Sequence, residues 1–286
     1  MRPLDASPAA RSRRAVMKHG LSASALAWYS AGGVAMAQAQ TQTSPPLQVY
    51  AAGSLRAPLT EIARLYEAAS GVRTALTLGA SGLLRERIEQ GEPAQVFASA
   101  DTQHPQTLAA SGSQWLAPTL FARNQLCALS APGEAASSAT LLERMLNPAV
   151  RLGTSTPMAD PSGDYAWALF RRAEQLSPGA YAALDAKALK LTGSPASAQP
   201  PEGRGTYEWL MSEGRADIFL TYCTNALAAR KAAPALQMVQ IPPGLQVSAA
   251  YGLTARSGDA GALRFAQYLL APPAQAVFRQ HGFGPP

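Results

Sequence analysis

The sequence predicts an α/β fold in which a mixed, mostly parallel sheet is flanked by helices. Residues 47–52 alternate apolar side chains on one side, as a strand does, and the spacing changes after Gly53 to that of a helix. Residues 73–90 repeat this order of strand, small residues and helix, and a third short apolar strand follows at 96–99. Strands that alternate with helices are typical of parallel sheets whose two faces are covered.

A small polar residue follows each of these three strands: Ser54, Ser81 and Asp101. Ligands of α/β sheets bind beyond the carboxyl ends of the strands, so these residues are candidates for a site. We expect Ser54 to be the N-cap of the first helix, where a hydroxyl and unpaired amides together favour an anion. One such motif alone is explained by ordinary capping. The recurrence at Ser81 favours a binding site.

The remaining elements continue the alternation. Strands are predicted at 121–130, 151–155, 190–193, 218–222, 236–241 and 248–254, and helices after Asp160, at 203–214 and at 259–270, ahead of a terminal segment at 276–283. Asp160 before Pro161 is typical of a helix start, and we interpret it as a cap that binds local amides rather than a ligand. Tyr222 ends a buried strand, where its hydroxyl could bond the backbone or donate to a ligand.

Residues 1–37 are predicted to be a twin-arginine signal peptide. Arg13 and Arg14 precede an apolar stretch of small residues, which ends at a predicted cleavage site, Ala35-Met36-Ala37. A membrane anchor is the weaker interpretation, because the stretch is short and no charged stop follows it. With residues 38–46 as a linker, the mature chain is expected to be exported to the periplasm.

Charge and cysteine content argue against two classes of function, nucleic-acid binding and metal binding by cysteines. The signal carries five of the 24 basic residues and one of the 18 acidic ones, so the mature chain has a net charge of +2 and nucleic-acid binding loses its main support. Cys127 and Cys223 have no metal-like spacing. They could pair in an oxidising compartment, or they could be two separately buried thiols.

Several motifs together resemble the periplasmic molybdate-binding proteins of ABC importers. They are Tyr50-Ala51-Ala52-Gly53-Ser54-Leu55, Ala80-Ser81-Gly82, Ala98-Ser99-Ala100-Asp101, Asp160-Pro161-Ser162-Gly163-Asp164-Tyr165-Ala166, and Tyr222. The resemblance implies a two-lobed, type II solute-binding fold with the ligand in the cleft between the lobes. It implies a first lobe of residues 46–122 plus 232–286, a second lobe of residues 123–231, and a monomer.

The resemblance also implies a binding site for molybdate or tungstate that uses no cofactor and no metal ligand. The hydroxyl donors would be Ser54, Ser81 and Tyr222, the amide donors would be Ser162 and Arg204, and the partner would be an ABC permease in the inner membrane. Two positions depart from the family pattern, because Ser162 replaces an alanine and Arg204 replaces a small aliphatic residue. If only amides bind there, the side chains are free to vary. A guanidinium that reached the anion would relax selectivity.

Three alternatives remain. The ligand could be another anion, such as sulfate, thiosulfate or an organic anion, or the chain could present its ligand to a membrane-bound sensor. A serine hydrolase is disfavoured, since the segment around Ser81 lacks the second glycine of a nucleophile elbow. The mature chain offers only His104 and His281 as bases, and we expect both on the surface.

Overall fold

The computed structural model describes residues 45–112 and 114–286. The predicted signal peptide and residues 38–44 of the predicted linker lie outside these residues. Within the described part, none of the helices combines the length and the apolar character that a membrane span needs.

A sheet with the strand order β2-β1-β3-β9-β4-β7-β5-β6 organises the described residues, and β8 pairs with β4 beside it. The strands are β1 (Leu47–Ala52), β2 (Thr74–Gly79), β3 (Val96–Ala98), β4 (Thr119–Ser130), β5 (Leu152–Ser155), β6 (Leu189–Thr192), β7 (Ile218–Tyr222), β8 (Gln237–Gln240) and β9 (Ser248–Ala255). Strands β1, β2 and β3 pair in parallel, as do β5, β6 and β7. Strands β4, β8 and β9 add antiparallel pairs, so the predicted mixed α/β sheet is confirmed.

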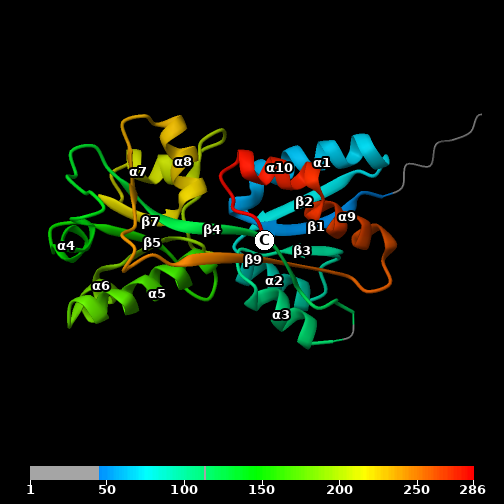
Figure 1. Ribbon diagram of the computed structural model, residues 1–286, viewed down its shortest axis with the longest axis horizontal. Coiled ribbons are helices and arrows are strands. Elements are labelled where there is room, and N and C mark those ends of the chain that lie inside the picture. Colours follow the sequence, from blue (N-terminus) through cyan, green and yellow to red (C-terminus); the bar gives the residue numbers. More distant parts are fainter. Residues whose placement is uncertain (1–44, 113) are drawn as a thin grey trace, which may run out of the picture. The chain divides into compact units, whose positions relative to one another are not determined.

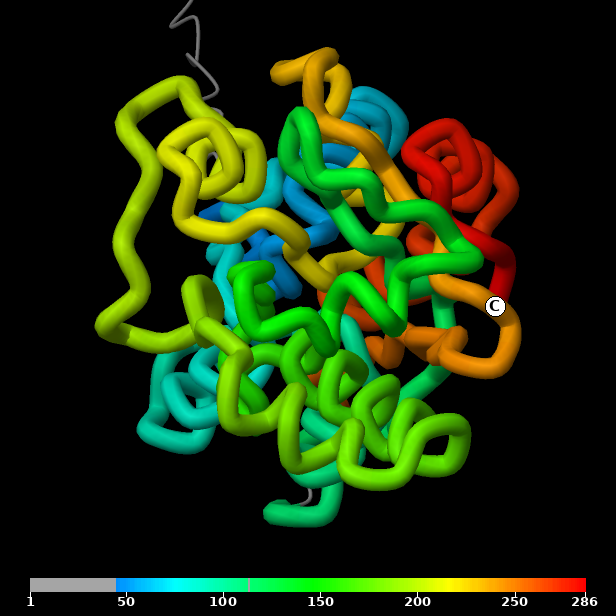
Figure 2. Tube along the Cα trace, turned by 90° about the vertical axis from the view of Figure 1, so that its left-hand side faces the viewer, coloured from blue at the N-terminus to red at the C-terminus, as the bar shows by residue number. Residues whose placement is uncertain are grey.

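The helices form two groups around this sheet (Figure 1). One group covers the β2-β1-β3 end: α1 (Arg56–Ser70), α2 (Ser81–Glu89), α3 (Gln103–Ala110), α9 (Ala260–Leu270) and α10 (Pro272–Gln280). The other covers the β7-β5-β6 end: α4 (Leu141–Leu146), α5 (Pro161–Leu176), α6 (Ala180–Lys187), α7 (Thr206–Ser212) and α8 (Cys223–Ala232). Figure 2 looks onto this second lobe, whose green and yellow chain faces the viewer.

The long strands β4 and β9 pass from one lobe to the other (Figure 1). The first half of β4 pairs with β9, and its second half pairs with β7 and β8. The expected lobe boundaries at 122/123 and 231/232 remain a prediction. The pairing of β8 with residues 127–130 favours a return to the first lobe after residue 240 rather than at 232.

The start of the first helix differs from the prediction. Residues Gly53–Leu55 form a 3-10 turn, and the N-cap of α1 is Leu55 rather than Ser54. The backbone N–H of Arg56 donates to the carbonyl of Gly53, so backbone rather than the Ser54 hydroxyl satisfies an amide at this helix start. Ser54 is therefore free to make other contacts.

The chain end also differs from the prediction. Helix α9 ends at Leu270, as predicted, but Pro272 then begins another helix, α10. A proline is well suited to the first position of a helix because its missing N–H would have no helical partner there. The predicted terminal segment at 276–283 is thus mostly the later part of a helix.

Candidate functional site

Ser54 and Ser81 follow β1 and β2 at the edge of the first lobe that faces the second. The Ser54 hydroxyl lies 2.9 Å from the Tyr251 hydroxyl on β9. Ser81 is the first residue of α2 and is 1% exposed, and its Oγ accepts the backbone N–H of Ala100 at 3.2 Å. Both serines therefore bond to segments that lie far from them in the sequence.

Ser162 and Tyr222 come from the second lobe, and within the described part of the chain both have a buried hydroxyl group without a partner. Ser162 is 1% exposed and Tyr222 is 2% exposed. The Oγ of Ser162 and the OH of Tyr222 are both shielded from solvent, and neither has a hydrogen-bond partner among the described residues. A buried polar atom without a partner costs about 1–3 kcal/mol, so these two hydroxyls are suited to a ligand that accepts hydrogen bonds.

The amide of Ser162 is engaged locally. It donates to Asp160 Oδ1 at 3.0 Å, and the Ser155 hydroxyl donates to Asp160 Oδ2 at 2.6 Å. Asp160 is therefore the N-cap of α5, as predicted, with Pro161 at the first helical position. Because the cap occupies the amide, the side chain of Ser162 is the group that remains able to donate to a ligand.

Among the described residues, no hydrogen bond or ion pair joins Arg204 to the other four predicted residues, and none joins two of those four directly. Its backbone N–H donates to the carbonyl of Pro201 at 3.1 Å. Its guanidinium donates twice to the Glu208 carboxylate, at 3.1 and 2.8 Å, and lowers the pKa of that carboxyl. Both groups that were expected to reach an anion are thus occupied by partners near α7.

Two further tyrosines, Tyr165 and Tyr251, lie beside the predicted donor Tyr222. The Tyr222 ring centroid lies 5.6 Å from that of Tyr251 and 6.2 Å from that of Tyr165. Burial raises the pKa of Tyr165 to about 12, and it raises the pKa of Tyr222 and Tyr251 well above the ordinary range. All three hydroxyls therefore stay protonated at neutral pH and can donate.

Tyr251 and Asn124 are candidates that the sequence analysis missed. The side-chain amide of Asn124 donates to Tyr251 OH at 3.4 Å and to Thr224 Oγ1 at 2.9 Å. With Ser54, these residues form a hydrogen-bonded chain that runs from the first lobe across β9 and β4 to α8. Tyr251 and Asn124 lie on strands whose neighbours are set by long-range pairing, and no local motif marks them.

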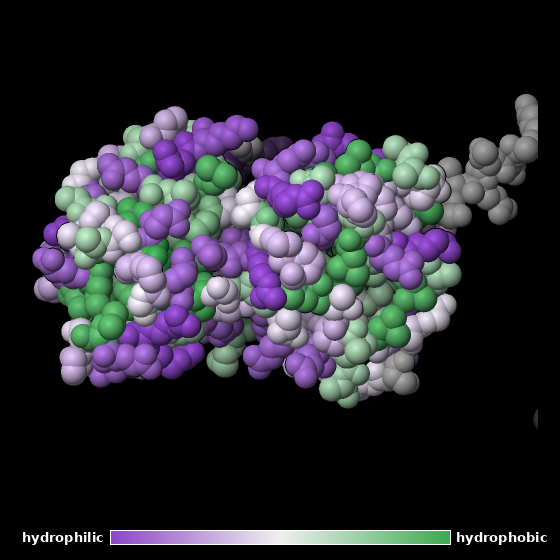
Figure 3. Space-filling model, in the orientation of Figure 1, coloured by the Kyte–Doolittle hydropathy of each residue, from purple (hydrophilic) through white to green (hydrophobic). Residues whose placement is uncertain are grey.

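The two lobes touch at the start of α2. The N–H of Gly82 donates to the carbonyl of Ala159 at 2.9 Å, and the Tyr165 hydroxyl donates to the carbonyl of Ala100 at 3.3 Å. A Cβ on Gly82 would lie 2.3 Å from the Met158 carbonyl oxygen, which is too close for any side chain. Figure 3 shows a notch between the lobes at the upper edge and filled surface below it.

Carboxyl groups lie on the second-lobe side of this contact. Burial raises the pKa of Asp160 and Asp164, while the hydrogen bonds that Ser155 and Ser162 donate to Asp160, and that Met158 donates to Asp164, partly offset this effect. The His104 side chain is only 12% exposed and lies 3.8 Å from Asp101, so its expected surface position is wrong. His281 is 31% exposed and pairs with Glu61 at 3.1 Å.

No group of three or more His, Cys, Asp or Glu residues in residues 45–112 and 114–286 is placed to hold a metal ion. The donors described above are hydroxyls and amides. Such a set suits the oxygen atoms of an anion, which replace their water shell with hydrogen-bond donors.

Three solved structures share the fold of this chain. The periplasmic molybdate-binding protein of Azotobacter vinelandii has a TM-score of 0.65 and 20% identity, over 84% of this chain and 99% of that one. The sulfate-binding protein SubI of Mycobacterium tuberculosis has a TM-score of 0.67 and 17% identity, over 84% and 86%. PEB3 of Campylobacter jejuni, solved with L-phospholactate, has a TM-score of 0.64 and 17% identity, over 83% and 99%. These likenesses confirm the two-lobed type II binding-protein fold.

Two sequence relatives and one family match indicate which protein family the chain belongs to. An uncharacterized protein of Pasteurella multocida is 36% identical over 242 residues, which make up 84% of this chain and 98% of that protein. The molybdate-binding protein ModA of Mycobacterium tuberculosis is 35% identical over 94 residues, which make up 32% of this chain and 36% of that protein. Residues 47–284 match the family described as bacterial extracellular solute-binding protein. Because that match spans nearly all of the described residues, the chain belongs to the bacterial extracellular solute-binding protein family.

Proposed function

We propose that this chain captures a tetrahedral oxyanion, molybdate or tungstate, in the bacterial periplasm and delivers it to an ABC importer. The observation that carries the proposal is the pair of buried hydroxyls, Ser162 Oγ and Tyr222 OH, that lack a partner among the described residues. Two donors of this kind next to the contact between the lobes match the need of an anion for hydrogen bonds. The local likeness to a molybdate-binding protein of Mycobacterium tuberculosis supports molybdate over other anions.

The binding mechanism uses neutral donors. Ser54 and Ser81 supply hydroxyls from the first lobe, and Ser162 and Tyr222 supply them from the second. Neutral donors avoid the desolvation cost of a buried counter-charge, which can cancel the attraction it provides. Since the donors come from both lobes, an anion that bonds to all four would favour the closed arrangement, in which Gly82 meets Ala159.

The carboxyl group of Asp160 favours a second candidate, an anion that keeps a proton at neutral pH, such as hydrogen phosphate. Asp160 is partly buried, and its charge adds to the effect of burial in raising the pKa of Tyr222 and Tyr251, so it lies within electrostatic reach of both hydroxyls. A carboxylate can accept a hydrogen bond from a protonated ligand, whereas it repels a dianion. A single series of thermal-shift measurements distinguishes the two candidate ligands.

The test is a thermal-shift series on the mature protein with molybdate, tungstate, sulfate, phosphate and glycerol phosphate. A ligand that binds only the folded state raises the Tm by mass action. We expect molybdate and tungstate to raise the Tm and the other three to leave it unchanged. A shift with phosphate but with neither molybdate nor tungstate would favour the second candidate, and no shift with any of the five would contradict both.

The variant Tyr222→Phe tests whether the Tyr222 hydroxyl binds the ligand. Removal of a hydroxyl that has no partner should leave the Tm of the unliganded protein unchanged or higher, because the cost of that buried group disappears. The same change should weaken molybdate binding by about 1.5–3 kcal/mol, the usual value of a hydrogen bond to a charged group. Tyr66→Phe is the matched control, because Tyr66 OH is also buried without a partner but lies between α1 and α9.

A further inference from the structure

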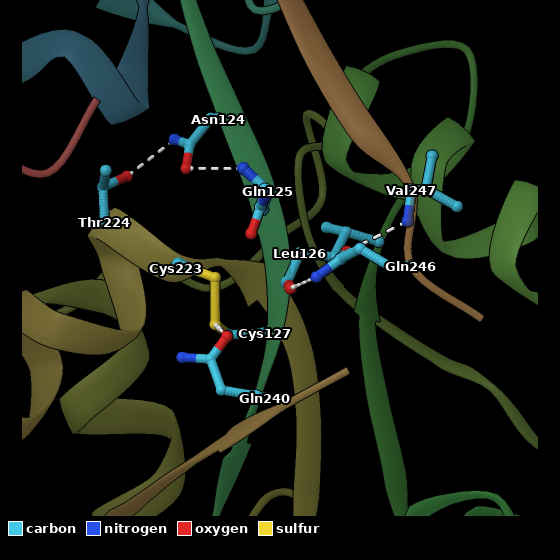
Figure 4. Close-up of a disulfide and its surroundings, with 9 residues drawn as sticks. All are labelled: Asn124, Gln125, Leu126, Cys127, Cys223, Thr224, Gln240, Gln246 and Val247. Atoms are coloured by element: carbon cyan, nitrogen blue, oxygen red, sulfur yellow. Dashed lines mark hydrogen bonds between the residues drawn. A yellow bond between two sulfur atoms is a disulfide. The ribbon is translucent and has the colours of Figure 1, made fainter. Parts of the chain in front are cut away.

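A disulfide lies directly beside the proposed ligand residue Tyr222. Cys127 on β4 and Cys223, the first residue of α8, are joined, with their Cα atoms 4.8 Å apart (Figure 4). The pairing settles the alternative that the sequence left open. Cys127 is fully buried, and Cys223 immediately follows Tyr222 in the chain.

Three successive residues, Tyr222 and the two that follow it, are each bonded to β4. Tyr222 itself pairs with Leu126 in the sheet. The next residue carries the disulfide, and the one after it, Thr224, accepts a hydrogen bond from Asn124 at 2.9 Å (Figure 4). The turn from β7 into α8 is therefore held at three consecutive points by one strand.

The disulfide is the strongest of these three attachments because it is covalent. From Cys127, β4 runs back towards the first lobe. Asn124 lies three residues before Cys127 and donates to the Tyr251 hydroxyl, which bonds Ser54. Two thiols in place of the disulfide would have to separate to van der Waals contact. Because Cys127 is 0% exposed and belongs to a cluster of buried apolar residues, that separation would move the start of α8 and the Tyr222 ring with it.

We propose that the Cys127–Cys223 disulfide positions the Tyr222 hydroxyl for the ligand, so that affinity depends on the oxidised state of this pair. The inference rests on the proposed function, because it assumes that Tyr222 contacts the bound anion. A disulfide that only stabilised the fold would leave the affinity of the folded protein unchanged. Cys127 and Cys223 act here as positioning residues and do not themselves touch the ligand.

The test is a double-mutant cycle measured by titration calorimetry with molybdate, at a temperature where circular dichroism shows every variant to be folded. Cys127→Ala with Cys223→Ala should weaken binding by roughly tenfold or more, a typical loss when the support of a binding group is removed. In the Tyr222→Phe background the same pair of changes should cost less than about twofold, because the group that the disulfide positions is already gone. In the Tyr66→Phe background the full loss should persist.

Reduction of the wild-type protein provides a second measurement that does not depend on the variants folding. Dithiothreitol should lower the affinity of the folded protein, and reoxidation should restore it. Unchanged affinity after reduction, or an equal loss with and without the Tyr222 hydroxyl, would overturn the inference. If the oxidised wild-type protein binds neither molybdate nor tungstate, the proposed function fails first. The inference then falls with it, and this outcome is distinct from binding that is insensitive to the disulfide.

Discussion

We expect Gly82→Ala to hinder closure of the two lobes without lowering the stability of the unliganded fold. Gly82 lies in the first turn of α2, where its N–H donates to the Ala159 carbonyl of the other lobe. An added Cβ would lie 2.3 Å from the Met158 carbonyl oxygen and 2.8 Å from that of Ala159. Both contacts are with backbone atoms, which cannot rotate away as the end of a long side chain could.

The expected loss follows from two costs. Overpacking of a close contact costs about 1–3 kcal/mol, and loss of the interlobe hydrogen bond adds about 0.5–1.5 kcal/mol. If the ligand binds the closed form, these costs weaken affinity by roughly 10- to 1,000-fold, at about 1.4 kcal/mol for each factor of ten. Within the helix itself alanine is favoured over glycine by about 1 kcal/mol. The unliganded protein should therefore unfold at the same denaturant concentration as wild type or at a higher one.

The assay combines titration calorimetry with molybdate, small-angle X-ray scattering and urea unfolding. Gly79→Ala is the matched control. A Cβ there would meet only Leu84 of the same lobe, at an ordinary distance of 3.4 Å. We expect Gly82→Ala to bind weakly and to scatter as a more open molecule with molybdate present, while Gly79→Ala behaves as wild type. Wild-type affinity and wild-type scattering for Gly82→Ala would refute the reasoning that this contact forms on closure.

The remaining predictions concern the donors and the charges around them. Ser54→Ala and Ser81→Ala should each weaken molybdate binding by about 1–3 kcal/mol in calorimetric titrations, and wild-type affinity in both would remove these serines from the site. Arg204→Ala should change affinity little, because Glu208 and Pro201 already occupy its guanidinium and its amide; a large loss would show that the guanidinium reaches the ligand. Burial raises the pKa of Asp160, and an anion bound nearby would raise it further, so binding should take up a proton and strengthen as pH falls. Asp160→Asn keeps an N-cap and should flatten this dependence, and an equally steep profile in that variant would assign the proton to another group.

Local rules explain what the sequence predicted correctly. Asp160 before Pro161 specifies a helix start through contacts within three residues, and the structure has this cap. The sequence also placed Tyr222 correctly, at the carboxyl end of a buried strand that ends where apolar residues give way to α8. Such features depend on neighbouring residues alone, so a single sequence carries them.

The parts that sequence reasoning missed depend on distant contacts. The Ser54 hydroxyl bonds Tyr251, a residue 197 positions away, instead of capping α1. The disulfide joins cysteines separated by 96 positions. The spacing of residues along the chain does not determine either contact, because the first depends on the position of β9 in the sheet and the second on the antiparallel pairing of β4 with β7.

Equilibrium dialysis with elemental analysis tests the central claim most directly. The oxidised mature protein is dialysed against molybdate in excess sulfate and phosphate, and the bound molybdenum is counted per chain. We expect one molybdenum atom per chain, displaced by tungstate and strongly reduced in Tyr222→Phe but not in Tyr66→Phe. No retained molybdenum, or retention that Tyr222→Phe leaves unchanged, would contradict the proposed oxyanion site between the lobes.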